Sequence, residues 1–128
     1  PISPVRAILY EPDPAVLRAG LVRQLAERLG AEQVDPEISL LTADRAQPTP
    51  FAHAYRVLDV LPFSEKGLRA ELRRRGVGRV TLKKRGSAVD TEALGRRLRL
   101  KGDGDATVLL TRLLGRPLAI LVEPQPTT

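Results

Sequence analysis

Residues 64–86 read SEKGLRAELRRRGVGRVTLKKRG, and the first half of this stretch has the pattern of an amphipathic helix. Ser64 favours the N-cap position, because its hydroxyl can accept a hydrogen bond from a free backbone N–H of the first turn. Leu68 and Leu72 follow at helical spacing and therefore share one face. We expect this helix to end at Gly76.

The second half of the same stretch predicts a strand. Gly76 and Gly78 allow the backbone to turn tightly after the helix. Residues 79–83 then alternate, with Val80 and Leu82 on one side and polar side chains on the other. The stretch therefore predicts a helix, a glycine turn and a half-buried strand.

Short apolar runs around this unit complete the predicted architecture. Strands are expected over 54–61, 107–113 and 118–123, with a hairpin signal at 115–117, and Asp90 is expected to cap a second helix. The resulting order is β-α-β-α-β-β. This order indicates an α+β fold in which a mixed β-sheet has its helices packed on one face.

The N-terminal part predicts a smaller β-α extension. A strand is expected over 5–10 and a weaker one over 38–42, and residues 44–50 have the composition of a connector. Asp13 and Pro14 start one helix that ends at Gly30. The apolar face of this helix is formed by leucines that recur every four residues: Leu17, Leu21, Leu25 and Leu29.

These patterns give three expected regions: an extension over 1–50, the β-α-β-α-β-β domain over 51–124, and a tail over 125–128. The sequence contains no cysteine, which excludes disulfides and thiolate metal sites and makes a reducing cytoplasm the default location. No apolar run reaches the ~20 residues that a membrane span needs, so no membrane partner is expected. The first residue is proline rather than methionine, and we therefore expect the chain to be part of a longer protein.

Positive charge is concentrated in residues 64–86, which hold nine Lys/Arg against two acidic residues, a net charge of +7. Residues 1–63 have a net charge of −2, whereas residues 64–128 have +8. Clustered positive charge on a small domain is typical of proteins that bind a nucleic-acid backbone. An alternative stays open: Arg outnumbers Lys 17 to 4, so genomic codon bias also explains a basic surface.

The predicted phosphate contacts lie on the helix-turn-strand stretch, where basic side chains converge from neighbouring elements. Arg79 and Lys83 share the polar side of the strand, and we expect them to form one continuous patch with the end of the preceding helix. Gly76 and Gly78 shape the backbone turn. The full set of predicted phosphate-binding residues is Arg73, Arg75, Arg79, Lys83, Lys84 and Arg85.

No pattern of an active site is visible in the sequence. His53 is the only histidine, and the chain lacks a glycine-rich nucleotide loop or a nucleophile motif. Asp103 and Asp105 are expected in a turn rather than a calcium loop. The arginines at 96, 97 and 99 end a helix, where the helix dipole favours cations. We therefore expect no catalytic residue, metal or cofactor within this chain.

Three stretches resemble the C-terminal region of bacterial class I SAM-dependent methyltransferases, which ends in a THUMP-like domain. They are LYEPDPAVLRAG (9–20), LTAD (41–44) and GVGRVTLKKRG (76–86). THUMP domains are RNA-binding modules attached to tRNA-modifying enzymes. The resemblance implies a parent methyltransferase that uses SAM and an RNA partner such as tRNA or rRNA. The alternative is a module that packs against the methyltransferase domain of the same chain and orients it without binding nucleic acid.

Overall fold

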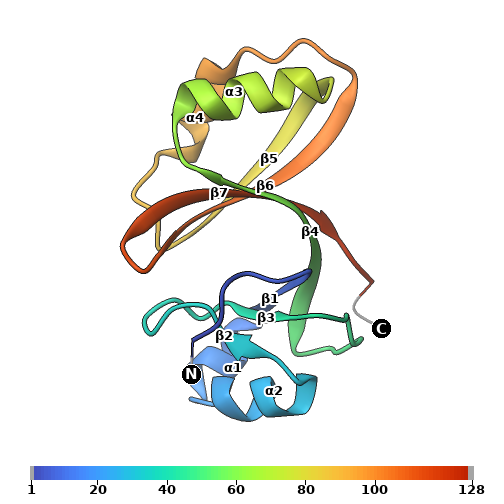
Figure 1. The fold of residues 1–128 in the computed structure, drawn as a ribbon, viewed down its shortest axis with the longest axis vertical. Helices are drawn as coiled ribbons and strands as arrows, with labels where there is room; N and C mark the ends of the chain where they lie inside the picture. Colours follow the sequence, from blue (N-terminus) through green and yellow to red (C-terminus); the bar gives the residue numbers. More distant parts are fainter. Residues whose placement is uncertain (1, 127–128) are drawn as a thin grey trace. The chain divides into compact units, whose positions relative to one another are not determined.

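The computed structural model describes residues 2–126, which form seven strands and four helices (Figure 1). Strands β5 and β6 pair in parallel, and β6 and β7 pair antiparallel. The expected α+β fold with a mixed sheet is confirmed. The elements are β1 (Ile8–Pro12), α1 (Pro14–Arg18), α2 (Val22–Leu29), β2 (Glu32–Gln33), β3 (Leu41–Ala43), β4 (Ala52–Pro62), α3 (Glu65–Arg74), β5 (Val77–Arg85), α4 (Thr91–Leu98), β6 (Gly104–Leu113) and β7 (Arg116–Pro124).

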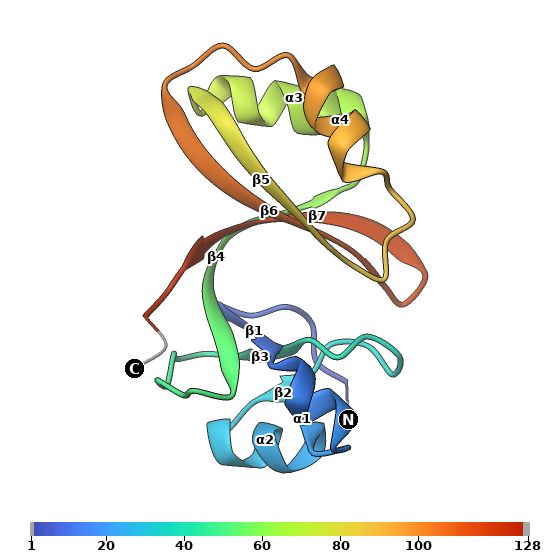
Figure 2. The same ribbon diagram turned by 180° about the vertical axis from the view of Figure 1, so that it is seen from behind.

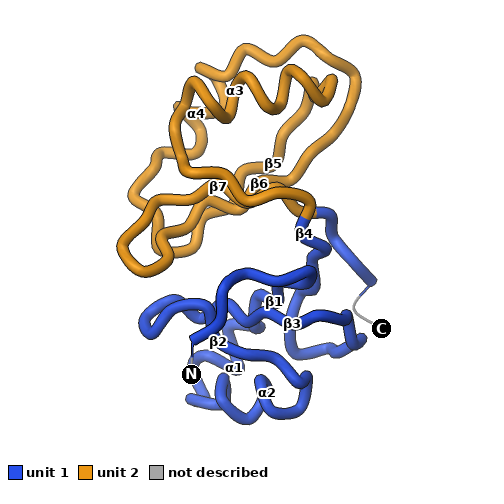
Figure 3. The backbone as a smooth tube through the Cα atoms, viewed as in Figure 1, with its two compact units in different colours: residues 1–57, 123–128 blue, residues 58–122 orange. Residues whose placement is uncertain are grey.

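The chain divides into two compact units, which Figure 3 distinguishes by colour. Unit 1 comprises residues 1–57 and 123–128, and unit 2 comprises residues 58–122. Strand β4 contributes its first half to unit 1 and its second half to unit 2.

Unit 1 is an antiparallel sheet with α1 and α2 packed on one face. Its strands lie in the order β2-β3-β1-β4, and β1 pairs with both β3 and β4. The core of this unit joins the sheet and the helices through side chains such as Tyr10, Leu25, Leu29 and Leu41. Residues 52–56 therefore belong structurally with β1, although the sequence placed them in the following domain.

The prediction of one continuous helix from Pro14 to Gly30 is wrong. Gly20 has a φ of 69°, which is left-handed backbone, and the chain leaves helical geometry between α1 and α2. Leu17 and Leu21 lie at this break and remain 42% and 46% exposed. The four-residue leucine spacing continued through the break and therefore concealed it. Gly30 does end α2, with a φ of 61°.

Unit 2 has the expected order β4-α3-β5-α4-β6-β7, and its strands lie side by side as β4-β7-β6-β5. Both helices cover the same face of the sheet (Figure 2). Their buried side chains form one core with residues of β6 and β7: Leu68, Leu72, Leu94, Leu98, Val108, Leu110, Ala119 and Leu121. The prediction that the helices lie on one face is confirmed.

Local signals in unit 2 act as the sequence indicated. The Ser64 hydroxyl accepts a hydrogen bond from Gly67 N (2.9 Å), and the Asp90 carboxylate accepts one from Ala93 N (3.1 Å). The β6–β7 hairpin is present, but its turn lies at Leu114 and Gly115, with φ values of 50° and 81°. Two positive φ values match the right-handed strand twist, which explains why the turn is one residue earlier than expected.

The expected C-terminal tail lies only partly within the described residues. The backbone N–H of Gln125 donates to Ala54 O at 2.8 Å, so the chain is still attached to β4 after β7 ends. The remainder of that prediction, residues 127 and 128, lies outside the described residues.

Candidate nucleic-acid interface

The basic stretch folds as α3, a tight turn and β5. Arg75 forms the C-cap of α3, and Gly76 follows with a φ of 72°, a conformation that costs glycine least. The carbonyl of Gly76 accepts a hydrogen bond from Gly104 N at 2.9 Å. The turn between α3 and β5 is therefore fastened to the first residue of β6.

The glycines of this turn are required for backbone packing. A Cβ on Gly78 would lie 1.7 Å from the carbonyl oxygen of Gly102, and a Cβ on Gly102 would lie 2.0 Å from that of Gly76. Two chain segments thus touch directly, backbone against backbone. This contact explains Gly78 without invoking a ligand.

The structure does not join the predicted contacts into one patch. Val80 and Leu82 pack against the core that α3 and α4 cover, as predicted. Because side chains alternate along a strand, Arg79 and Lys83 point to the opposite face. Arg73 belongs to α3 and lies on the helix side of the sheet. The prediction of a continuous patch of Arg73, Arg79 and Lys83 is therefore wrong, since strand alternation separates them.

Arg75 and Arg79, both predicted phosphate contacts, form ion pairs with carboxylates. Arg75 Nε lies 2.6 Å from Glu71 Oε2, and Arg75 Nη2 lies 3.7 Å from Asp59 Oδ2. Arg79 Nε lies 3.1 Å from Asp105 Oδ1. The Arg79 and Asp105 side chains are 83% and 75% exposed, and ion pairs at such exposed positions add little stability. A guanidinium in such a pair remains accessible to another anion.

Glu71 holds two arginines at the end of α3. The hydrogen bond from Arg74 is the largest cause of the lowered pKa of the Glu71 carboxyl, and the hydrogen bond from Arg75 is the next largest. The hydrogen bond to Glu71 also raises the pKa of Arg74. This carboxylate neutralises part of the charge at the turn.

The end of β5 carries the remaining predicted contacts. Lys84 and Arg85 are exposed, whereas Lys83 is half-buried. The Thr111 hydroxyl donates to Arg85 O at 2.7 Å and fixes the strand end. Within residues 2–126, Lys84 has no carboxylate partner. Strand β5 is also the last in the strand order, and basic side chains on such an edge discourage edge-to-edge association, which is a second explanation for this charge.

Two arginines of α3 cap the C-terminal end of α4. Arg69 Nη2 donates to Arg97 O at 3.0 Å, and Arg73 Nη2 donates to Arg99 O at 3.1 Å. Carbonyls at a helix C-terminus have no partner within the helix, so these bonds satisfy groups that otherwise need water. Arg73 thus has a structural role as well as a charge.

The arginines of α4 join these two residues in a group that the sequence did not reveal. We call Arg69, Arg73, Arg97 and Arg99 the helix-end cations, because these four residues take part in the hydrogen bonds between α3 and the end of α4. Glu65 is 3.0 Å from Arg69 and 2.8 Å from Arg97, and its pKa is lowered chiefly by the hydrogen bond from Arg97. The helix dipole explains why arginines occur at 96, 97 and 99, but it does not predict the hydrogen bonds that residues 97 and 99 accept from α3.

One signal in the sequence points to this group. Arg99 is the C-cap of α4 with a φ of 49°, a position at which glycine is usual. The absence of glycine there leaves a positively charged side chain at the helix end. A search for missing C-cap glycines would have identified it.

Charge follows the division into units. Unit 2 holds 15 Lys/Arg and seven Asp/Glu, a net charge of +8, whereas unit 1 has a net charge of −2. Among the described residues, no group of three or more His, Cys, Asp or Glu side chains is arranged to hold a metal ion. In the same part of the chain, no helix is long and apolar enough to cross a membrane.

The fold and surface define a small α+β domain with a strongly cationic second unit. The sequence model of the THUMP domain-like family matches residues 52–124, and the chain belongs to this family. The match begins at the start of β4, whereas the structural division into units falls within that strand.

Relatives extend the comparison to the first unit. Two proteins described as uncharacterized S-adenosylmethionine-dependent methyltransferases, from the CDC 1551 / Oshkosh and H37Rv strains of Mycobacterium tuberculosis, are each 40% identical over 112 residues. The alignment covers 88% of this chain and 31% of each relative. The chain therefore spans about a third of their length. The expected resemblance to the THUMP-like region of SAM-dependent methyltransferases is confirmed.

A solved structure shares the fold. The crystal structure of a candidate methyltransferase from Porphyromonas gingivalis W83 superposes with a TM-score of 0.78 at 24% identity. The superposition covers 97% of this chain and 31% of that chain. At this level of identity the likeness concerns the fold.

Proposed function

We propose that this chain is the RNA-docking domain of a SAM-dependent methyltransferase. It would bind structured RNA, such as tRNA or rRNA, through the phosphate backbone and present it to a methyltransferase domain of the same polypeptide. The observation that carries the proposal is the net charge of +8 on unit 2, where most Lys and Arg side chains are exposed. Release of counterions from neutralised phosphates makes such a surface favourable for RNA.

The six predicted residues remain the proposed phosphate contacts, and their ion pairs suggest an order among them. Lys84, which has no carboxylate partner within residues 2–126, lies at the exposed end of β5 and would contribute most directly. Arg85 is exposed beside it and would add a further contact. Arg75 and Arg79 would exchange a carboxylate for a phosphate, which reduces their net gain. Arg73, on α3, and Lys83, on β5, would act from opposite sides of the sheet. SAM would be bound by the methyltransferase domain of the parent protein.

Charge reversal tests the proposal with a matched control. Changing Lys83, Lys84 and Arg85 to Glu lowers the net charge from +6 to zero. Changing Arg18, Arg23 and Arg45, exposed residues of unit 1, to Glu lowers it by the same amount. In a titration with fluorescently labelled tRNA, the first variant should lose binding and the second should retain most of it. Equal loss in both variants would mean that net charge alone, and no particular surface, determines binding.

A second function is favoured by an exposed apolar hollow in unit 1. It has a volume of about 290 Å³ and is lined by Val16, Leu21, Leu25 and Phe51 among others. Leu21 and Phe51 are 46% and 44% exposed and line the same hollow, and exposed apolar side chains that lie together can mark an interaction surface. Such a surface suits a module that packs against the methyltransferase domain and orients it without binding nucleic acid.

The two functions predict opposite results in the full-length enzyme. The packing function predicts that Leu21→Ser with Phe51→Ser abolishes methyl transfer, while the Lys83, Lys84 and Arg85 reversals leave it unchanged. The RNA-docking function predicts loss of activity on RNA in the reversal variant. Thermal unfolding of each variant shows whether a loss of methyl transfer is caused by unfolding.

A further inference from the structure

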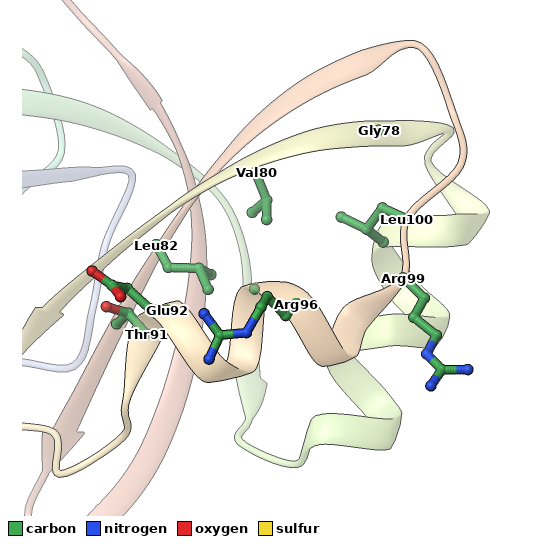
Figure 4. A pocket seen from close by; sticks show the side chains of 9 residues that line it. Gly78, Val80, Leu82, Thr91, Glu92, Arg96, Arg99 and Leu100 are labelled. Atoms are coloured by element: carbon green, nitrogen blue, oxygen red, sulfur yellow. The ribbon is translucent and has the colours of Figure 1, made fainter.

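A groove in unit 2 runs between α4 and the outer edge of β5. Its volume is about 680 Å³, within the range of small-ligand sites, and its lining includes Val80, Leu82, Leu100, Gly95 and Arg96. Figure 4 shows Val80, Leu82 and Leu100 directed into the space between the strand and the helix. Its border also carries Arg96, Arg99 and the carboxylate of Glu92, so the groove has aliphatic walls and a border with charges of both signs.

Gly95 is the residue that packing does not explain. It lies inside α4, where glycine destabilises a helix by ~1 kcal/mol relative to alanine. A Cβ at this position would meet only Leu82 Cδ1, at 3.9 Å, which is an ordinary van der Waals distance. The fold thus has room for alanine, in contrast to Gly78 and Gly102. A glycine that the fold does not need, facing a groove, indicates close approach by a ligand.

Arg96 supplies an available charge beside this glycine. Its side chain is exposed and forms neither an ion pair nor a hydrogen bond within residues 2–126. It starts from α4 alongside Leu82, whereas the Arg99 side chain extends away from Val80 and Leu82 (Figure 4). Glu92 also lines the groove, but within residues 2–126 Arg96 forms no ion pair with it, so its guanidinium can contact an anion.

Strand β5 adds directional groups. It is the terminal strand of the order β4-β7-β6-β5, so alternate backbone N–H and C=O groups face away from β6. These donors and acceptors belong to the strand whose residues Val80 and Leu82 line the groove. They are suited to hydrogen bonds with the edge of a planar polar ligand.

We propose that this groove holds one unpaired nucleotide of the bound RNA. The base and ribose would lie on Val80, Leu82 and Leu100 beside Gly95, and the phosphate would contact Arg96. The inference rests on the proposed RNA-docking function. A nucleotide fits better than an extended peptide, because the border of the groove carries an available guanidinium and β5 is lined with basic residues that oppose strand addition.

The test compares two RNAs on the 128-residue chain: a blunt stem, and the same stem with a short unpaired extension. The measured quantity is the ratio of their dissociation constants. We expect the extension to tighten binding about tenfold, which corresponds to ~1.4 kcal/mol. The ratio should fall to about one both in Gly95→Leu, which fills the groove, and in Arg96→Gln. The Gly95→Leu variant should retain its affinity for the blunt stem.

Matched variants separate the groove from general effects. Ala70→Leu introduces a leucine, as Gly95→Leu does, but at an exposed position of α3, and it should leave the ratio of the two dissociation constants unchanged. Lys66→Gln removes one exposed charge at the start of α3 and should lower the affinity for both RNAs by the same factor. Gly95→Ala, which the fold accommodates, should raise the melting temperature and lower the ratio, a combination that a structural role cannot give.

Each outcome decides the inference. Equal binding of both RNAs by the unaltered chain, or a ratio that Gly95→Leu and Arg96→Gln leave unchanged, overturns it while the proposed function stands. Absence of binding to either RNA overturns the proposed function as well. If a short extended acidic peptide binds, loses affinity in Gly95→Leu, and the RNA ratio stays unaffected, the groove is a strand-addition site and the inference is wrong.

Discussion

Alanine at Gly78 should destabilise the protein strongly, because the structure leaves no room for a side chain there. The new Cβ would lie 1.7 Å from Gly102 O, whereas ordinary contact begins at 3.4 Å. The two segments must therefore separate by about 1.7 Å. Overpacking of this kind costs ~1–3 kcal/mol, and the neighbouring hydrogen bond from Gly104 to Gly76 adds ~0.5–1.5 kcal/mol if it breaks.

We expect the free energy of unfolding to fall by about 2–4 kcal/mol in Gly78→Ala. Urea denaturation followed by circular dichroism measures this quantity. Gly104→Ala, whose Cβ would lie 3.1 Å from Gly76 O, should have a smaller effect. Gly95→Ala, with 3.9 Å to its nearest neighbour, should stabilise the fold by ~0.5–1 kcal/mol.

The order of these three variants tests the reasoning more strictly than any single value. A change below ~0.5 kcal/mol in Gly78→Ala would refute the packing explanation, because substitutions away from structural constraints stay within that range. If Gly78→Ala instead weakened RNA binding at unchanged stability, Gly78 would serve phosphate contact rather than the fold.

Three further predictions follow from the described contacts. Leu94→Ala should lower the free energy of unfolding by ~2–5 kcal/mol, since Leu94 is fully buried, and thermal unfolding will show it. Glu71→Gln should destabilise at neutral pH. Because the folded pKa of Glu71 is lowered, this difference is present above its ordinary value of 4.5 and disappears as the pH falls through the lowered pKa, as urea titrations at several pH values will reveal. Lys84→Ala should reduce RNA affinity more than Arg79→Ala, because only Arg79 has Asp105 nearby; fluorescence anisotropy compares the two.

Much of unit 2 was predictable because its local signals agree with its packing. Ser64 and Asp90 cap helices as their residue types favour, and Val80 and Leu82 alternate with polar residues in β5. Unit 1 was less predictable. Gly20 breaks a helix while the leucine spacing runs on, and β2 has only two residues, too few to form a pattern.

The candidate interface was predictable in composition but not in arrangement. Alternation correctly placed Val80 and Leu82 against the core, yet it could not show that α3, which carries Arg73, packs on that same side of β5. The helix-end cations depend on contacts such as Arg69 to Arg97 O, between residues 28 apart in the chain. No local pattern contains that information, because it arises only when α3 and α4 pack together.

The salt dependence of RNA binding tests the central claim most directly. Binding of the 128-residue chain to structured RNA is measured by anisotropy over a series of salt concentrations. If ~4 phosphates are neutralised, log K should fall with log[salt] with a slope of roughly −3. A slope near zero, or no binding even at low salt, would contradict the claim that unit 2 docks RNA through its phosphates.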